Sequence, residues 1–236
     1  MTIKIYEVGG SIRDSFLGKV NKDLDYSVEA PSYEAMVEHI ESTHKKLIKD
    51  KNGNPIGHKF LTVRAIGNDG LAKDYVMCRK EGAYSDQRHP DSVEVGTIYD
   101  DLARRDFTVN AIARDVETGD IIDPHGGIAD LKEMTLRAVG SAEKRFKEDP
   151  LRMIRAVRFS ITKNLCLHYD IFEILNDGRW AKELRTVSTE RIREEMYKCF
   201  KHDTAETLLF LRTYCSEEFV VELFNRGLWL KPTLEK

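Results

Sequence analysis

The spacing of apolar residues changes near residue 139, and this change constrains the fold more than any other feature of the chain. Up to residue 138, runs that alternate in the manner of strands are interleaved with runs at helical spacing. From residue 139 to residue 236, almost every run has helical spacing, and no low-complexity linker separates the two parts. The sequence therefore predicts an α+β fold, with a mixed sheet and helices over residues 1–138 followed by an all-α part over residues 139–236.

The composition is that of a soluble globular protein, because 236 residues with 41% hydrophobic and 33% charged residues can bury a core under a polar surface. The net charge of −3 excludes a global basic excess, so any polyanion must bind to a local basic patch. No apolar run approaches membrane-spanning length, and the amino terminus is typical of a strand and not of a signal peptide. Scattered cysteines without a CxxC pair indicate reduced thiols, so we expect a cytoplasmic protein without a zinc site or disulfides. The cysteines are Cys78, Cys166, Cys199 and Cys215.

A Gly-Gly turn follows the first expected strand, which covers residues 3–8. Residues 11–18 then have the pattern of a short helix that ends at a glycine. Such a turn lets backbone N–H groups approach an anion, and the start of the helix adds partial positive charge. With the full charge of Arg13, the sequence predicts a phosphate-binding site at Gly9, Gly10 and Arg13.

Asp23 and Asp25 lie one residue apart in the next expected strand, residues 22–29, and therefore point to the same face. Neighbouring carboxylates repel each other unless they are exposed, protonated or bound to a cation. Mg²⁺ prefers carboxylate oxygens and substrate phosphates, and two such ions about 4 Å apart can clamp a phosphoryl transfer. A DxD pattern alone also fits a solvated strand end, but beside the Gly-Gly turn we interpret it as a metal site.

Asp74 is a third carboxylate of interest, in a strand-like run over residues 72–80 that can pair beside the strand of Asp25. It is a candidate for deprotonating an attacking hydroxyl or for holding a metal ion. An ordinary surface residue of a strand fits the same pattern equally well.

Residues 100–115 have a pattern that favours a helix, on which Arg105, Asp106 and Asn110 fall within about one turn. An adjacent arginine and aspartate can hold triphosphate oxygens and ribose hydroxyls, respectively. These three residues are predicted nucleotide ligands, although the segment taken alone also fits an exposed, salt-bridged helix.

The segment EDPLRMIRAVRF, residues 148–159, offers a means of recognising a base. Asp149, expected to cap a helix that begins at Pro150, is three residues from Arg152, so their side chains can lie together, with Glu148 holding Arg152. A carboxylate only accepts and a guanidinium only donates, which matches the Watson–Crick edges of cytosine and adenine. Uracil or guanine would leave a mismatch that costs about 1–3 kcal/mol per unpaired group.

Arg152, Arg155 and Arg158 follow one another at intervals of three residues along one expected helix, which gives a local basic patch. Phosphate contacts from such patches supply most sequence-independent affinity for nucleic acids. The competing interpretation is a solvated helix face whose arginines pair with acids such as Glu195.

Several motifs occur in one order: GGSIRDSFLG with DLDY, RRDFTVNA, DPHGG and EDPLRMIRAVRF. Together, from residue 6 to about residue 160, they resemble the class II tRNA nucleotidyltransferases and bacterial poly(A) polymerases of the polymerase β superfamily. The resemblance implies a nucleotidyltransferase head over residues 1–138, followed by a helical neck and shortened body over residues 139–236 that bind nucleotide and RNA.

The resemblance also implies roles for individual residues. Asp23 and Asp25 would bind catalytic Mg²⁺, with two ions, and Asp149 and Arg152 would read the incoming base without a nucleic-acid template. RRD would contact the nucleotide, and the DxxGG turn would support the hinge between head and neck. The residues of these last two motifs are Arg105, Asp106, Asp123, Gly126 and Gly127.

Two departures from the family bear on the activity. The family usually continues through body and tail domains that hold the tRNA elbow, whereas this sequence stops at Lys236. The stretch GHKFLTVRA also lacks the arginine-rich GRRFRL motif associated with poly(A) polymerases, which favours CCA-type addition.

We therefore expect an enzyme that adds C and A from CTP and ATP to an RNA 3′ end, with the tRNA acceptor end as the first choice and no membrane partner. Three alternatives stay open at this point: a poly(A) polymerase, a partial enzyme that adds only CC or only A, and a non-catalytic RNA-binding protein. The sequence does not predict the oligomeric state.

Overall fold

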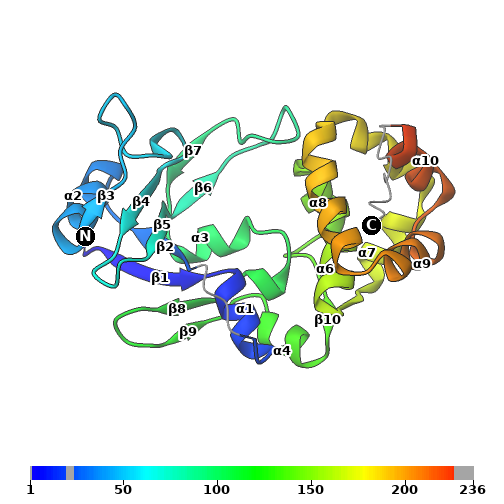
Figure 1. Ribbon diagram of the computed structural model, residues 1–236, viewed down its shortest axis with the longest axis horizontal. Helices are drawn as coiled ribbons and strands as arrows, with labels where there is room; N and C mark the ends of the chain where they lie inside the picture. Colours follow the sequence, from blue (N-terminus) through cyan, green and yellow to red (C-terminus); the bar gives the residue numbers. More distant parts are fainter. Residues whose placement is uncertain (1, 20–23, 226–236) are drawn as a thin grey trace, which may run out of the picture. The chain divides into compact units, whose positions relative to one another are not determined.

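The computed structural model describes residues 2–19 and 24–225, and these form two compact units (Figure 1). The first, here called the head unit, contains Met1–Ser85 and His89–Glu133. The second, the helical unit, contains Asp86–Arg88 and Met134–Lys236. The domain boundary expected after residue 138 stays a prediction; by internal contacts the chain divides between Glu133 and Met134.

The head unit is built on a seven-stranded mixed sheet with the strand order β3-β4-β5-β2-β1-β8-β9 (Figure 1). The strands are β1 (Lys4–Val8), β2 (Asp25–Glu29), β3 (Lys46–Leu47), β4 (Thr62–Ile66), β5 (Ala72–Met77), β8 (Ala113–Asp115) and β9 (Ile121–Ile122). Central strand β2 runs parallel to β5 and antiparallel to β1, whereas the other neighbours in this sheet are antiparallel. A separate two-stranded ribbon joins β6 (Arg79–Glu81) to β7 (Val93–Val95).

Short helices complete the head unit. They are α1 (Gly10–Phe16), α2 (Tyr33–Thr43), α3 (Ile98–Ala103), α4 (Gly127–Lys132) and the 3₁₀ helices η1 (His58–Phe60) and η2 (Thr108–Asn110). Helix α2 has apolar residues at helical spacing, and its Met36 and Ile40 are buried with Val28, Val63 and Met77 of the sheet. This packing fixes β2, β4 and β5 side by side.

The helical unit confirms the change of pattern near residue 139. Its helices are α5 (Ala142–Glu148), α6 (Leu151–Lys163), α7 (Tyr169–Asn176), α8 (Thr189–His202), α9 (Thr204–Tyr214), α10 (Glu217–Asn225) and the 3₁₀ helix η3 (Gly178–Thr186). Helix α6 lies against α8 and α9, and its Ile154 and Val157 are fully buried. A pair of two-residue parallel strands, β10 (Thr135–Leu136) and β11 (Cys166–Leu167), is an addition that helical spacing did not predict.

The helix expected over residues 100–115 is wrong. Helix α3 begins at a capping box of Thr97 and Asp100 and ends at Ala103; η2 and then β8 follow it. Phe107 and Val109 are fully buried, and β8 pairs with β1. Burial and sheet pairing therefore override the local helical pattern in this segment.

The expected helix start at Pro150 is also shifted. Asp149 is the C-cap residue that follows α5, and α6 begins at Leu151 after Pro150. The carboxylate of Asp149 nevertheless accepts a hydrogen bond from the Leu151 backbone N–H, at 3.1 Å, as a capping residue does. The strand expected over residues 22–29 is described as Asp25–Glu29, and residues 20–23 lie outside the described residues.

The DPHGG turn shows why glycine is required at residue 127. Both oxygens of Asp123 accept hydrogen bonds from the first backbone N–H groups of α4, at Gly127 (2.7 Å) and Ile128 (2.9 Å). A Cβ on Gly127 would lie 2.1 Å from the backbone oxygen of Thr108, so α4 can approach η2 only with glycine at this position.

Replacing Gly127 with Ala should therefore lower the free energy of unfolding by about 2 kcal/mol or more, because backbone must shift to relieve the clash. The matched control is Gly67→Ala, whose Cβ would meet the flexible ends of Asp69 and Lys73 and should cost only about 0.5 kcal/mol. Urea unfolding measures both values. Equal stability of the two variants would contradict this account of the turn.

Candidate active site

Two carboxylates lie side by side on the parallel strands of the head sheet. Asp25 is the first residue of β2, and the register pairs it with Asp74 of β5. Residues in register on neighbouring strands point to the same face. The expectation that the run around Asp74 pairs beside the strand of Asp25 is confirmed, whereas Asp23 lies outside the described residues.

An arginine offsets the repulsion between these two acids. Arg64, opposite Asp74 on β4, holds it in a forked ion pair with Nε–Oδ1 and Nη2–Oδ2 distances of 2.7 and 2.5 Å. Hydrogen bonding and attraction from Asp74 raise the pKa of Arg64, and the charge of Asp25 adds to the rise. Asp74 can bind a metal ion only if the cation displaces the guanidinium of Arg64 or shares the carboxylate with it.

The Gly-Gly turn adopts the predicted form. Gly9 has φ +75°, and α1 begins at Gly10. A Cβ on Gly9 would lie 3.2 Å from Nη1 of Arg105, so this guanidinium lies against the turn. Two predicted nucleotide ligands that are far apart in the sequence therefore meet.

Arg13 lies below the turn in a buried chain of hydrogen bonds. Its guanidinium donates to Asp14, at 2.8–2.9 Å, and to the side-chain oxygen of Asn110, at 2.6 Å. Asn110 in turn donates to Asp106 at 3.0 Å. The structure thus brings the three predicted residues Arg13, Asp106 and Asn110 together, and direct contact of Arg13 with phosphate stays a prediction.

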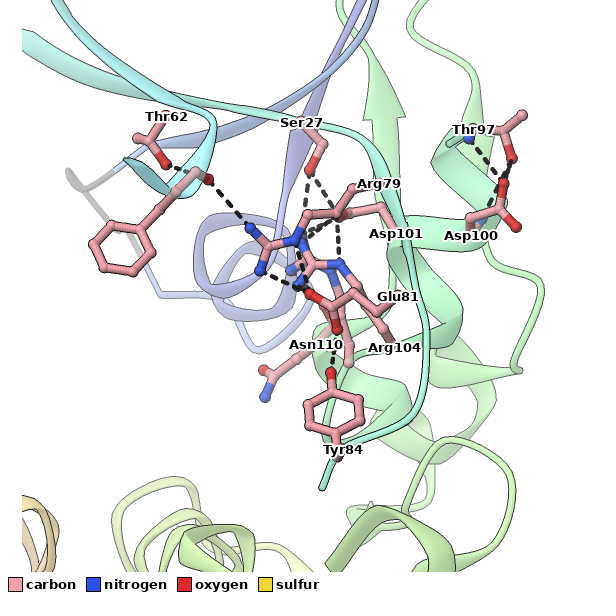
Figure 2. Close-up of polar contacts among 12 residues, drawn as sticks. Ser27, Thr62, Arg79, Glu81, Tyr84, Thr97, Asp100, Asp101, Arg104 and Asn110 are labelled. Atoms are coloured by element: carbon pink, nitrogen blue, oxygen red, sulfur yellow. Dashed lines mark hydrogen bonds and ion pairs between the residues drawn. The ribbon is translucent and has the colours of Figure 1, made fainter. Parts of the chain in front are cut away.

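A buried acid that sequence reasoning missed organises the arginines of the RRD motif (Figure 2). The fully buried Asp101 accepts hydrogen bonds from Ser27 Oγ (2.9 Å), Arg105 Nη2 (3.0 Å) and Arg104 Nη2 (2.5 Å). Burial alone would raise the pKa of Asp101, but attraction from Arg105 and Arg104 more than compensates and holds the pKa below its usual value. The spacing of an acid three and four residues before two arginines was the available signal.

The same cluster extends to the ribbon of β6 and β7. Arg104 donates to Glu81 at 3.1 Å, and Glu81 also binds Arg79, at 2.7 Å, and the hydroxyl of Tyr84. Arg79 in turn donates to the backbone oxygen of Phe60 at 3.1 Å. Ion pairs and hydrogen bonds therefore connect the end of α3 to β6, to Tyr84 and to η1 (Figure 2).

In the helical unit, both residues of the predicted base-reading pair have charged partners. Asp149 binds Arg191 of α8, with distances of 2.8 Å (Nη2–Oδ2) and 3.4 Å (Nη1–Oδ1). Arg152 donates to Glu148 at 3.1 Å, which confirms the expected contact, and to the backbone oxygen of Arg145 at 3.3 Å. The sequence offered no reason to place Arg191 opposite Asp149.

The predicted basic patch on α6 is partly neutralised. Arg158 donates to the buried Glu195 of α8, and Arg155 lies 3.9 Å from the same carboxylate. Both guanidiniums lie over the ring of Phe159, at 4.0 and 5.4 Å from its centroid. The pairing with Glu195 that was weighed as the competing interpretation is therefore present.

Further limits on the site come from the described residues. Among residues 2–19 and 24–225, no group of three or more His, Cys, Asp or Glu side chains is arranged to hold a metal ion. The four cysteines are free thiols. None of the described helices combines the length and the apolar character needed to cross a bilayer.

Comparison with known proteins identifies the family. A family model described as the poly A polymerase head domain matches residues 5–137, which is more than half of the chain. The chain belongs to the poly A polymerase head-domain family. The resemblance seen in the motifs is thereby confirmed.

Relatives within this family carry the name CCA-adding enzyme. The enzyme from Lactobacillus johnsonii is 38% identical over 216 residues, which are 90% of this chain and 50% of the relative. The enzyme from Geobacillus thermodenitrificans is 37% identical over 228 residues, or 96% of this chain and 53% of the relative. The chain thus spans about half the length of the curated relatives it matches.

Solved structures of the family share the fold. The CCA-adding enzyme of Bacillus stearothermophilus in complex with CTP is 35% identical with a TM-score of 0.73, over 89% of this chain and 47% of that one. A CCA-adding enzyme with ATP is 28% identical (TM-score 0.70; 94% and 49% covered), and the Thermotoga maritima enzyme complexed with tRNA is 26% identical (0.70; 94% and 48%). The expected α+β fold, with a mixed sheet and helices followed by a helical region, is confirmed.

The lowered pKa of Asp101 gives this head domain a testable pH dependence. The charged carboxylate stabilises the fold above about pH 4, and this contribution is lost as the pH falls through the folded-state pKa. Asp101→Asn should therefore flatten the pH dependence of the free energy of unfolding below about pH 4, by up to about 1.4 kcal/mol per pH unit for one proton. At neutral pH the variant should be about 3 kcal/mol less stable, because two partly buried arginines lose the charge of a fully buried acid.

Urea unfolding between about pH 2.5 and 7 measures both quantities for the wild type and the variant. Parallel pH profiles for the two proteins would mean that the pKa of Asp101 does not differ between the folded and unfolded states.

Proposed function

We propose that this chain transfers CMP and AMP from CTP and ATP to the 3′ end of tRNA, without a nucleic-acid template. The observation that carries the proposal is the in-register pair of Asp25 and Asp74 in a head unit where Arg105 lies against the Gly9 turn. The head unit thus carries carboxylates that can hold metal ions and a guanidinium that can bind phosphate, and phosphoryl transfer needs both kinds of group to stabilise the charge on the transferring phosphate. The names of the relatives, CCA-adding enzymes with CTP, ATP or tRNA, support the choice of substrates.

Membership of the family implies metal-dependent catalysis, and the acids of β2 and β5 suit Mg²⁺. Asp25 and Asp74 provide adjacent hard oxygen donors, and Asp23 would complete the set. Two bound Mg²⁺ ions would supply electrostatic stabilisation of the charge that develops on the phosphate oxygens. In this proposal Asp23 and Asp25 hold the metal ions. Asp74 either binds a metal ion with them or accepts the proton of the attacking hydroxyl.

The other head residues bind and orient the nucleotide. Backbone N–H groups of Gly9 and Gly10, together with Arg105, would take triphosphate oxygens, because the guanidinium already lies beside the turn. Asp106 and Asn110, joined by a 3.0 Å hydrogen bond, would take the ribose hydroxyls. Arg13 would act on Asn110, whose side-chain oxygen it binds, or on phosphate directly.

Residues of the helical unit would select the base and grip the RNA. Asp149 and Arg152 would accept from and donate to the edge of cytosine or adenine, each held in place by a charged neighbour. Arg155 and Arg158 would contact phosphate with the donors that Glu195 leaves available.

A poly(A) polymerase is the second candidate, because the matching family model carries that description. Such an enzyme would add A alone to many RNAs, so product length on tRNA and on a generic RNA separates the two activities. Sequencing of product ends on tRNAs that stop at N73, C74 and C75 identifies a partial CC-adding or A-adding enzyme. Absence of Mg²⁺-dependent incorporation would leave a non-catalytic RNA-binding protein.

The double variant Asp23→Ala, Asp25→Ala should lose at least about a thousandfold in incorporation of labelled CTP into tRNA that lacks CCA, because the carboxylates stabilise transferring phosphate through their metal ions. Chelation of divalent ions from the wild type should have the same effect. Asp120→Ala, in the exposed turn between β8 and β9, is the control and should retain activity. Full activity of the double variant would eliminate the mechanism.

The double variant Asp149→Ala, Arg152→Ala should lose the preference for CTP and ATP over UTP and GTP. The expected fall in the ratio of kcat/KM values is about tenfold to a hundredfold, corresponding to one or two unpaired groups. Arg179→Ala, an 87% exposed arginine of the same unit that pairs with Asp177, is the matched control and should leave the ratio unchanged. An unaltered preference in the double variant means that other groups read the base.

A further inference from the structure

Asp101 connects strand β2 to Arg105 through a single oxygen. Its Oδ2 accepts from both Ser27 Oγ, at 2.9 Å, and Arg105 Nη2, at 3.0 Å, and Arg105 also donates to Ser27 at 3.3 Å. Ser27 follows Asp25 by two residues on β2, so the two side chains lie on the same face of the sheet. This triangle of hydrogen bonds fixes the guanidinium on the face that carries Asp25.

The second oxygen of Asp101 serves a different purpose. Oδ1 accepts from Nε and Nη2 of Arg104, which continues to Glu81 and Arg79 in the cluster of Figure 2. Asp101 is therefore anchored by the rest of the head unit through Oδ1 and holds Arg105 through Oδ2. Because Asp101 is itself held in place, its hydrogen bond to Arg105 restricts the conformations that the long arginine side chain can adopt.

Arg105 still has a donor to offer. Nη1 donates to the backbone oxygen of Asn110 at 3.2 Å and lies against Gly9. The Nε–H group is buried and has no hydrogen-bond partner among the described residues. A buried donor without an acceptor is costly, and a phosphate oxygen would satisfy it.

We propose that Asp101 is a positioning residue for the triphosphate of the nucleotide: anchored by Arg104 and Ser27, it fixes Arg105 over the Gly9 turn so that the free donor meets a phosphate oxygen. The inference rests on the proposed function for the identity of the anion. Preorganisation of this kind lowers the ordering cost of binding, so its loss should weaken triphosphate binding and not only the stability of the fold.

The test compares Asp101→Asn with Glu81→Gln, in the full chain. Both variants remove the charge of a buried acid from the same cluster, but among the described residues the ion-pair partners of Glu81 are Arg104 and Arg79, and not Arg105. Inorganic tripolyphosphate is the probe, with its dissociation constant measured by calorimetry at fixed salt, alongside the melting temperature and the KM and kcat for CTP. Tripolyphosphate carries no base or ribose, so it reports on the anion site alone.

The expected result is a dissociation constant for tripolyphosphate raised about tenfold or more in Asp101→Asn, with a matching rise in KM for CTP, and a change of less than about twofold in Glu81→Gln. Both variants should melt at lower temperature. If binding weakens in both variants in proportion to the loss in melting temperature, the role of Asp101 is structural and the proposal is overturned. The same holds if the wild type does not bind tripolyphosphate.

Ser27→Ala keeps the proposal open to refutation should Asp101→Asn fail to fold. Ser27 is buried and small, so alanine fits, and the variant removes one of the two groups that fix Oδ2. It should bind tripolyphosphate about threefold more weakly than the wild type, and unchanged binding would overturn the proposal. A wild type that binds tripolyphosphate as expected but incorporates no nucleotide would refute the proposed function and leave the positioning role intact.

Discussion

The parallel pairing of β2 with β5 is the constraint on which the candidate site depends. In a sheet whose other neighbours are antiparallel, this pairing sets Asp25 directly beside Asp74. Two like charges at that spacing are unfavourable without a cation, and Arg64 on β4 provides one from within the protein. The order β4-β5-β2 therefore places a guanidinium, a carboxylate and a second carboxylate in one row, and packing of α2 on the same strands maintains it.

Acids that are buried wholly or in large part hold arginines in both units. Asp101 holds Arg105, Glu148 holds Arg152 and Glu195 holds Arg158, and all three acids lie in or beside helices. Ion pairs of this kind add little net stability, because removing charges from water offsets their attraction, but breaking one by loss of a partner is costly. Their value here is geometric: a guanidinium held on one side can present its remaining donors to a ligand without first being ordered.

Local patterns predicted the parts of the structure that local energetics decide. The Gly9 turn, the strand that carries Asp74 and the helical second half follow from glycine conformation and from apolar periods of two and 3.6 residues. The segment after α3 was mispredicted because burial of Phe107 and pairing of β8 with β1 are tertiary events. Asp101 was missed for a related reason: its partner Ser27 is 74 residues away, and an acid that is fully buried reads in sequence like any acid on a helix surface.

The hydrogen bonds of Asp149 bear on how an amino-acid pair can distinguish bases. A carboxylate has about four acceptor positions, and the contacts from Leu151 N and the two Nη atoms of Arg191 take three of them. One acceptor position on Oδ2 is then left for a base under the proposed recognition. Cytosine and adenine each present an amino N–H there, whereas the carbonyl oxygen of uracil or guanine would meet a second acceptor. Because these contacts take the other positions on Asp149, a rotated base would still meet the mismatch, and under the proposed recognition Arg191 is as important to base choice as Asp149 and Arg152.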